Sequence, residues 1–490
     1  MQRSVIFVLA YCLLPTASCL GKEESFDIAL LDGARVGTLT TTVTSEKDNK
    51  LLRVKAVLDL TLRRFGSPVR LRMEQGSIES PDGTILAVFM KQLPGGGRSL
   101  VLDGTVIDDD KLLVKVTGIR EFERRVPWKR DVLGLVQQER LFATKKPKPG
   151  DKFSFLRYEP TYNSVLTVRV VVKPREAVDV LGKKQTLLRV ELTPDELKGS
   201  NITVKPHKAV WWLDDSFAVV RKQTEMDGLG TLILVRTAKG KAVAVTSAVS
   251  ADIGKRSLVP LDRVIARPYD TRSLTYRITV RGEDKPAVLF VQDGHQSIRN
   301  VKGDTFELRV NPIRAGTPGK EKPTLEYLAS NHYIDHTDPR VKELARRAVG
   351  SEKDPWKRAL RIERFVKNHL RNDNTTDLAP ASRIAKDLRG DCRHHALLTA
   401  AMCRAAGLPS RTAIGLLYVH RGSPYLGFHM WAEVLINGQW LGIDSTLGKG
   451  GVSATHVKIT QHSWHEAQSL TPLLPVSRVT GKLRISVVAD

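Results

Sequence analysis

Apolar and polar side chains alternate along most of the first half of the chain. The alternation is clear in residues 69–74, 166–170 and 188–192, where every second side chain is Val, Leu or Met. A period of two places successive side chains on opposite faces of a strand. Turn-forming groups of Pro, Gly and Asp separate these runs. The pattern predicts a large antiparallel β domain over residues 22–248, with one polar face.

A second, shorter set of alternating runs follows this domain. Residues 276–281 and 306–310 again carry an apolar side chain at every second position. They predict a small β module over residues 256–314. The next stretch, residues 315–323, is rich in Gly, Pro and Lys and is therefore predicted to be a linker.

Beyond this linker the spacing of apolar residues becomes helical. Asp338 and Asp354 are each followed by a proline, which places a capping carboxylate before a proline at the first helical position. Apolar residues then recur every three or four positions. With the strand-like runs that follow, this predicts an α+β domain over residues 324–470. Residues 471–490 are predicted to be a C-terminal strand or tail.

These patterns predict a multidomain α+β protein, which a length of 490 residues also favours. With 41% hydrophobic and 27% charged residues, the composition is that of a folded protein and excludes wholesale disorder. The formal net charge is +24. Because the basic residues are spread along alternating runs and no nucleic-acid-binding motif accompanies them, no nucleic-acid partner is expected.

The first residues have the pattern of an export signal. Arg3 supplies a positive start, residues 5–14 are apolar, and residues 15–19 contain the small side chains of a cleavage region. Residues 1–20 are therefore predicted to be a signal peptide, and the protein is expected to be exported and periplasmic or associated with the cell envelope. The same segment approaches a lipoprotein box in which Cys19 would carry a lipid tether, although Thr16 stands where that pattern prefers Leu.

Two cysteines lie outside that segment, Cys392 and Cys403. On one helix they would lie ~16 Å apart along the axis. A disulfide requires Cα atoms within about 7 Å, so the two cannot form one. An exported protein would thus keep two free thiols. Cys403, deep in an Ala-rich helix, is expected to be an inert core thiol.

The sequence around Cys392 predicts a reactive thiol. Gly390 can end the preceding helix, and Asp391 is a good cap for the next one. Cys392 then falls in the first helical turn, where unpaired backbone N–H groups and the helix dipole favour a thiolate. Arg393 adds positive charge nearby, and the same N–H groups could hold a developing oxyanion.

Residues 428–444 have the pattern of a β-hairpin. Its turn is Asn437-Gly438, the strongest short hairpin signal. Counting back from a two-residue turn pairs Trp431 with Asp444. His429 shares the face of Trp431, so His429 and Asp444 are predicted to be diagonal neighbours, ~7 Å apart at the backbone. A carboxylate beside an imidazole is the base-and-orienter pair of a thiol enzyme.

Three blocks together resemble the transglutaminase-like family, especially its bacterial exported members. They are Gly390-Asp391-Cys392, His429 before Trp431-Ala432-Glu433-Val434, and Asp444-Ser445-Thr446. The likeness extends over about residues 338–459, and the blocks occur in the family order. It implies a papain-like α+β core with Cys392 as nucleophile, His429 as base and Asp444 as orienter. The family performs transamidation, its reverse, or peptide and amide hydrolysis through a thioester.

The resemblance also sets expectations for the surroundings of this trio. No cofactor is required, and the expected substrate is a protein or peptide, including cell-wall peptide. Further residues are candidates for lining the cleft: Asp391, Arg393, His395 and Trp431. Cys392 with His394 and His395 could suggest zinc, but no CxxC or HExxH partner set is present, so no metal is predicted.

Each candidate also has a purely structural interpretation. Cys392 could be a packed thiol, His429 a packed strand histidine, and Asp444 the cap of a turn. At the level of function, the alternative is a non-catalytic envelope binding or scaffold protein with a degenerate transglutaminase-like domain. Such a protein would use its basic sheet to hold an acidic or lipidic partner. Reactivity of Cys392 would separate the two.

Overall fold

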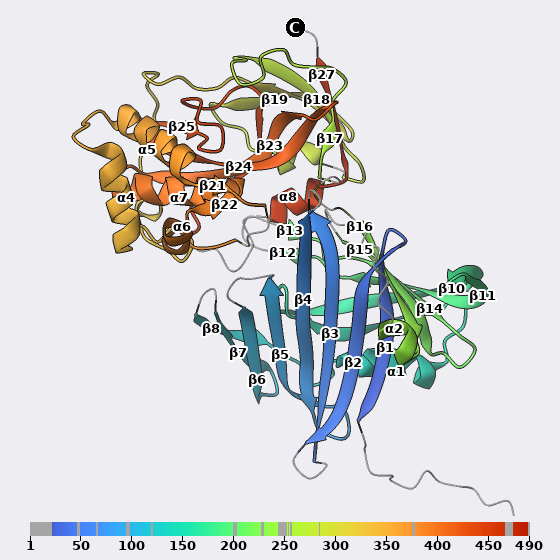
Figure 1. The fold of residues 1–490 in the computed structure, drawn as a ribbon. Coiled ribbons are helices and arrows are strands. Elements are labelled where there is room, and N and C mark those ends of the chain that lie inside the picture. Colours follow the sequence, from blue (N-terminus) through green and yellow to red (C-terminus); the bar gives the residue numbers. More distant parts are fainter. Residues whose placement is uncertain are drawn as a thin grey trace, which may run out of the picture.

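The computed structural model divides into two lobes (Figure 1). It describes residues 22–46, 50–64, 67–94, 99–118, 121–198, 203–226, 230–243, 252, 254, 257–283, 285–374, 378–465 and 474–488. The predicted signal peptide, residues 1–20, and Cys19 lie outside these residues. The first half of the chain forms a large curved sheet, and the second half forms a mixed lobe of helices and smaller sheets. The fold is α+β and multidomain, as the sequence predicts.

The first lobe is built on one 14-stranded antiparallel sheet. Its order is β8-β7-β6-β5-β4-β3-β2-β1-β16-β15-β14-β11-β10-β9. The strands are β1 (Glu23–Leu31), β2 (Ala34–Glu46), β3 (Leu51–Arg64), β4 (Ser67–Glu79), β5 (Ile85–Pro94), β6 (Leu100–Asp108), β7 (Lys111–Thr117), β8 (Phe122–Pro127), β9 (Lys152–Glu159), β10 (Ser164–Val180), β11 (Lys183–Pro194), β14 (Ala209–Leu213), β15 (Val219–Met226) and β16 (Gly230–Thr237). Pairing of β1 with β16 joins the two halves of the sheet.

The large sheet curls until its two ends approach each other. Val132, which follows the edge strand β8, forms a bridge with Leu156 of the opposite edge strand β9. The rings of Trp128 and Tyr158 lie 5.9 Å apart across the same junction. Helix α1 (Leu135–Lys145) connects the two edges and packs Phe142 against the inner face of the sheet. The alternating sequence therefore forms a curled sheet with an enclosed inner face.

A four-stranded sheet begins the second lobe. Its order is β19 (Gln296–Lys302), β20 (Thr305–Val310), β18 (Leu274–Val280) and β27 (Leu483–Val488). The outer strand comes from the end of the chain, where Ile485 pairs with Ile278. Buried side chains of this sheet form one core with Leu416 and Val457 of the neighbouring five-stranded sheet. The segment near the C-terminus thus completes a sheet whose other strands lie about 200 residues earlier.

The remaining elements form an α+β unit of four helices against a five-stranded sheet. The helices are α4 (Pro339–Val349), α5 (Pro355–His369), α6 (Ala381–Asp387) and α7 (Cys392–Ala405). The sheet has the order β17 (Val259–Pro260), β24 (Pro424–Ile436), β23 (Ser410–His420) and β26 (His456–His462), with β25 (Gln439–Ile443) also paired to β24. Short elements complete the description: α2 (Lys239–Val243), α8 (Leu474–Val479), β12 (Leu197–Lys198), β13 (Thr203–Val204), β21 (Arg371–Asn372), β22 (Arg389–Gly390), and the 3₁₀ turns Pro286–Leu289 and Leu325–Tyr327.

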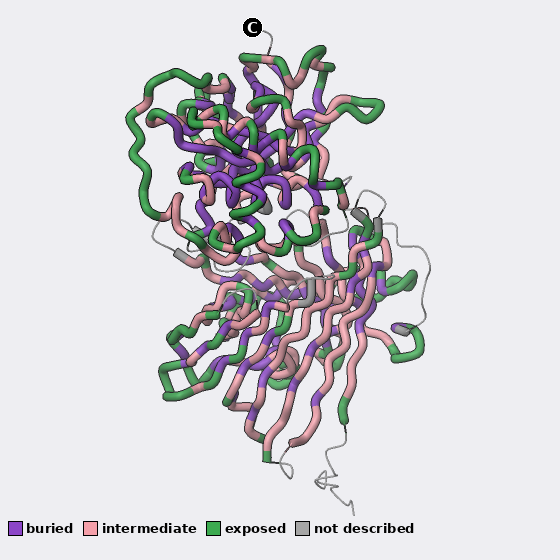
Figure 2. The backbone as a smooth tube through the Cα atoms, turned by 60° about the vertical axis from the view of Figure 1, so that its left-hand side comes forward, coloured by how far each residue is buried: buried purple, intermediate pink, exposed green. Residues whose placement is uncertain are grey.

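Helix α7 is the central element of this unit. The predicted caps of α4 and α5 are confirmed, because Asp338 and Asp354 accept hydrogen bonds from backbone N–H groups of the first turns. Both helices and α6 pack on α7, and α7 packs on β23 and β24. Every α7 side chain from His394 to Arg404 is buried. Figure 2 shows this dense core, in contrast to the large sheet, whose strands are mostly half-buried. None of the described helices has the length and apolarity needed to cross a membrane.

Candidate functional site

Cys392 is the first residue of α7, and its position is fixed by the turn before it. The Asp391 side chain caps the helix by accepting from the N–H of Arg393 at 3.0 Å, while His394 Nδ1 accepts from the N–H of Asp391 at 3.2 Å. Gly390 has φ +157°, and a Cβ there would lie 2.2 Å from the His394 ring. Only glycine therefore allows this turn, which leaves the Cys392 side chain half-buried at the helix tip.

The hairpin that carries the other two predicted site residues has the register expected from its turn. Ile436 pairs with Gln439, and the pairing continues without a bulge to Ala432 and Ile443. Asn437 and Gly438 both have positive φ, at 49° and 73°, as a tight hairpin turn requires. Asp444 follows β25 directly. The predicted register is confirmed.

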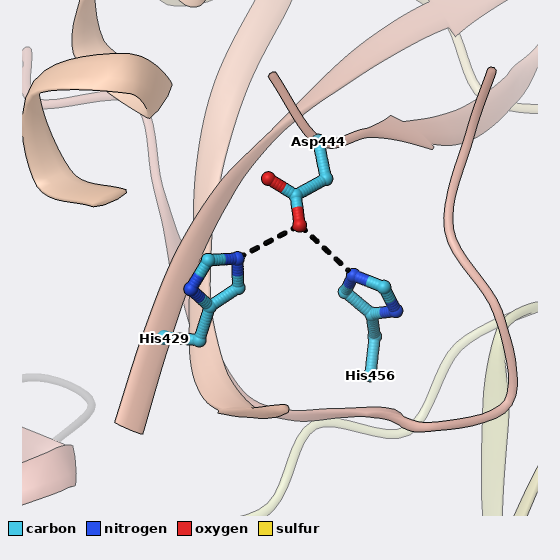
Figure 3. A group of neighbouring side chains, drawn as sticks. All are labelled: His429, Asp444 and His456. Carbon is cyan, nitrogen blue, oxygen red and sulfur yellow. Dashed lines mark hydrogen bonds and ion pairs between the residues drawn. The ribbon is translucent and has the colours of Figure 1, made fainter. Parts of the chain in front are cut away.

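His429 and Asp444 form a buried pair (Figure 3). His429 Nε2 lies 2.8 Å from Asp444 Oδ2, which leaves Nδ1 as the ring nitrogen available to the thiol. Burial by itself would lower the pKa of His429, but the Asp444 carboxylate and the neighbouring Cys392 sulfur together raise it to about 10. The same contacts hold the pKa of Asp444 far below its usual range, despite its burial. The structure thus brings Cys392, His429 and Asp444 together.

The comparison with known protein families identifies this part of the chain. Residues 342–445 match the model of the transglutaminase-like superfamily. The match includes α7, the hairpin and all three clustered residues. Residues 342–445 form a transglutaminase-like domain. No curated protein matches the chain in a sequence search.

Solved structures with partial likeness include three bacterial proteins. A proposed cysteine protease from Cytophaga hutchinsonii is 15% identical, covers 44% of this chain and 86% of its own, and has a TM-score of 0.31. The periplasmic domain of TgpA from Pseudomonas aeruginosa is 14% identical, with coverages of 36% and 91% and a TM-score of 0.26. A beta-barrel-like protein of unknown function from Brucella abortus is 10% identical, with coverages of 44% and 94% and a TM-score of 0.32.

His456 also contacts the site, although the sequence analysis assigned it no role there. Its Nε2 lies 3.2 Å from Asp444 Oδ2, so this oxygen accepts from two imidazoles (Figure 3). His456 Nδ1 accepts from the N–H of Ser453 at 3.2 Å, which fixes the proton on Nε2. Burial lowers the pKa of His456, although Asp444 opposes this effect. A neutral His456 therefore orients the carboxylate. In the sequence, His456 stands in Ala454-Thr455-His456-Val457-Lys458, a segment that also resembles the bacterial branch of the family, but this likeness assigned it no role.

Glu363 on α5 is a second support that the sequence did not reveal. Its carboxylate accepts from the backbone N–H of Asp444 at 3.0 Å, Gly450 at 3.0 Å and Gly451 at 3.2 Å. Burial raises the pKa of Glu363 to about 7, with a further contribution from the charge of Asp444, although the three N–H groups oppose the shift. The side chain thus anchors Asp444 and the loop after it to the helical layer.

Replacing Glu363 with alanine is expected to loosen Asp444 and weaken its hold on His429. Three N–H groups would lose their acceptor, and the loss at the buried N–H of Asp444 would cost about 1–3 kcal/mol. A displacement of Asp444 by about 1 Å would slow Cys392 alkylation by roughly 10- to 100-fold. The measurement is the iodoacetamide rate at pH 5.5, together with thermal unfolding. Glu363→Gln keeps one acceptor oxygen, so its alkylation rate should lie between those of the wild type and Glu363→Ala. An unchanged alkylation rate in folded Glu363→Ala would show that Glu363 does not position Asp444.

The other predicted cleft residues support the site from several sides. Asp391 is buried and forms an ion pair with Arg393 at 2.7 Å, so the Arg393 charge is balanced by the cap itself. His395 is buried and lies 3.2 Å from Asn372 Oδ1, and burial lowers its pKa to about 4. The ring of Trp431 is buried beside His429 and His456, at 6.3 and 5.3 Å between centroids. These residues fix the geometry from within the protein.

Cys403 is fully buried in α7, and both Cys392 and Cys403 are free thiols. Burial raises the pKa of Cys403, so it is an inert core residue, as the sequence predicts.

The donor atoms of His429, Asp444 and His456 lie within 4.8 Å of one another and could in principle hold a metal ion. In the structure, however, both imidazole Nε2 atoms are directed at one carboxylate oxygen. A metal would have to displace both protons. The arrangement therefore suits proton transfer better than metal binding.

Proposed function

We propose that the transglutaminase-like domain is a thiol-dependent acyltransferase or an amide or peptide hydrolase. Cys392 is the nucleophile, His429 the base and Asp444 the orienter. The observation that carries the proposal is the engagement of His429 Nε2 by Asp444 at 2.8 Å, with the Cys392 sulfur as the other neighbour of the ring. A nucleophile, a base and an orienter in series are the elements of nucleophilic acyl transfer.

The proposed reaction begins with transfer of the Cys392 thiol proton to His429 Nδ1. The sulfur attacks the carbonyl carbon of a side-chain amide or a peptide bond, and the former carbonyl oxygen becomes an oxyanion. Asp391 occupies the N–H of Arg393 with its side chain and those of His394 and His395 with its carbonyl. The N–H of Cys392 is then the first-turn donor for the oxyanion.

The leaving amine takes its proton from His429, and a thioester remains on Cys392. Water or a second amine then gives a proton to His429, attacks the thioester carbonyl and releases the Cys392 sulfur, which regains a proton. During both formation and breakdown of the thioester, His456 and Glu363 hold Asp444 in one orientation. Asp444 in turn holds the His429 ring.

The proposal places this chemistry outside the cytoplasm. It rests on the signal-like pattern of residues 1–20, with Cys19 as a point of lipid attachment. Proteins and peptides of the envelope, including cell-wall peptide, are the proposed substrates.

A reactive acyl donor tests the proposal without knowledge of the natural substrate. With p-nitrophenyl acetate, the protein should release a burst of p-nitrophenol and carry one acetyl group, which peptide mass spectrometry should locate at Cys392. Addition of a primary amine should yield the acetylated amine, and its share relative to acetate measures transfer against hydrolysis. Acetylation spread over surface lysines, with none on Cys392, would contradict a nucleophilic role for this residue.

A further inference from the structure

The inner face of the large sheet encloses a cavity of about 610 Å³, separate from the transglutaminase-like domain. This volume is typical of small-molecule sites. Its wall is formed by strands β4, β3, β2, β1, β16, β15 and β14, with α1 and the end of β9 across from them. Six strand spacings of about 4.8 Å give ~29 Å of sheet, measured around this curved wall. We refer to the cavity as the trough.

The wall of this trough is mainly apolar. Leu39, Leu58, Met73, Leu232 and Leu234 line it on neighbouring strands. All but Leu232 are only half-buried, although they lie on the inner face of the curled sheet. Residues of α1 line the opposite side of the cavity, and these apolar side chains remain partly uncovered. An apolar occupant would remove this surface from water.

The charged groups beside the trough balance one another. Glu139 of α1 forms ion pairs with Lys222 and, at 3.0 Å, with Arg236. Arg236 also donates to Asp27 at 2.9 Å. Two basic and two acidic side chains thus form one neutral cluster. The electrostatic complement of this part of the wall is an uncharged chain, because an ionic group placed there would have to break these pairs.

An extended peptide fits this trough poorly. The seven wall strands already pair on both sides within the sheet, so only the edge strand β9, across from them, could pair with a peptide backbone. A peptide in the trough would bury N–H and C=O groups without partners, whereas a hydrocarbon chain has none. Arg157 also lines the cavity. Its Nη2 pairs with Glu159 at 3.4 Å, whereas its buried Nε has no acceptor among the described residues.

We propose that the trough binds one long acyl chain, whose ester or carboxyl oxygen accepts from Arg157 Nε. The apolar wall of the trough, its paired charges and the unpartnered Arg157 Nε carry this inference, which is independent of the chemistry at Cys392. A free fatty acid and an acylated lipid both supply this chemistry.

The test measures displacement of a fluorescent 16-carbon fatty acid from the full-length protein. Palmitate represents a free fatty acid and 1-palmitoyl lysophosphatidylcholine an acylated lipid. Each competitor is used below its critical micelle concentration. Octanoate should bind at least about 100-fold more weakly than palmitate, because each buried methylene contributes roughly threefold in affinity. Equal affinity of octanoate and palmitate, or equal displacement by an apolar peptide, would overturn the proposal.

A matched pair of variants locates the site. Thr41 faces the trough, while Thr40, its neighbour on β2, faces the other side of the sheet. Thr41→Trp should weaken palmitate binding at least tenfold, and Thr40→Trp should leave it unchanged. Thermal unfolding confirms that both variants are folded. If Thr41→Trp does not fold, the comparison of octanoate with palmitate on the wild-type protein still tests the proposal. Equal binding by two folded variants would place the ligand elsewhere and overturn the assignment.

Discussion

Replacing Cys392 with alanine is expected to lower the rate of acyl transfer from p-nitrophenyl acetate by at least about 1000-fold. The sulfur is the atom that forms the acyl bond, and no other side chain at the tip of α7 can replace it. Loss of a nucleophile in systems of this type typically costs three or more orders of magnitude. The measurement is steady-state release of p-nitrophenol with an amine acceptor, corrected for the reaction without protein.

Cys403→Ala is the matched control for this prediction. It removes the same side chain from the same helix, but at a fully buried position. It should lower the unfolding temperature slightly through the small cavity it leaves and should keep the rate within about twofold. A Cys392→Ala variant that retains the wild-type rate would exclude Cys392 as the nucleophile.

Replacing Glu433 with alanine is expected to destabilise the protein by about 3–5 kcal/mol or to prevent folding. Glu433 accepts from Arg411 at 2.7 Å and from Lys458 at 2.6 Å, and all three side chains are buried. Removing the carboxylate leaves Arg411 without its ion-pair partner and Lys458 with Asp293 alone. Chemical denaturation of wild type and variant measures the difference. Glu343→Ala breaks an exposed pair with Arg346 and should change stability little, because solvent screens the pair.

The stabilisation that Glu433 provides should decrease as the pH falls. Burial alone would raise the pKa of Glu433, but Lys458 and Arg411 lower it to about 2. Because the folded pKa lies below the unfolded value of about 4.3, the stabilisation is complete above about pH 5 and is lost as the pH falls toward 2. The stability difference between wild type and Glu433→Ala should therefore shrink over this range. A difference that stays constant from pH 5 to pH 2.5 would contradict the ionic origin of the effect.

Local signals in the sequence predicted much of the transglutaminase-like domain. Asn437-Gly438 set the hairpin register, because a tight turn with two positive φ values aligns the strands that flank it. Asp338, Asp354 and Asp391 predicted helix starts, because a cap acts within one turn of the chain. These features were predictable because each depends on residues a few positions apart.

Contacts between distant segments were not predictable in the same way. Glu363 of helix α5 accepts from the backbone N–H of Asp444, 81 residues away in sequence. Every residue except proline has a backbone N–H group, so the identity of residue 444 gives no sign of this contact. His456 reaches Asp444 only because β26 pairs beside β23. In the large sheet, alternation predicts strands but not partners, so the pairing of β1 with β16 and the curling around α1 required the structure.

The most direct test of the central claim is the pH dependence of Cys392 alkylation by iodoacetamide. Asp444 and the Cys392 sulfur raise the pKa of His429 to about 10, so His429 stays protonated beside the sulfur from pH 5.5 to 8. The wild-type rate should therefore change little between pH 5.5 and 8. In His429→Ala the sulfur loses this neighbouring positive charge, which should lower the rate at pH 5.5 by at least about 100-fold. His420→Ala, at an exposed position on the same sheet, should behave as wild type. Identical pH profiles for wild type and His429→Ala would contradict the claim that His429 activates Cys392.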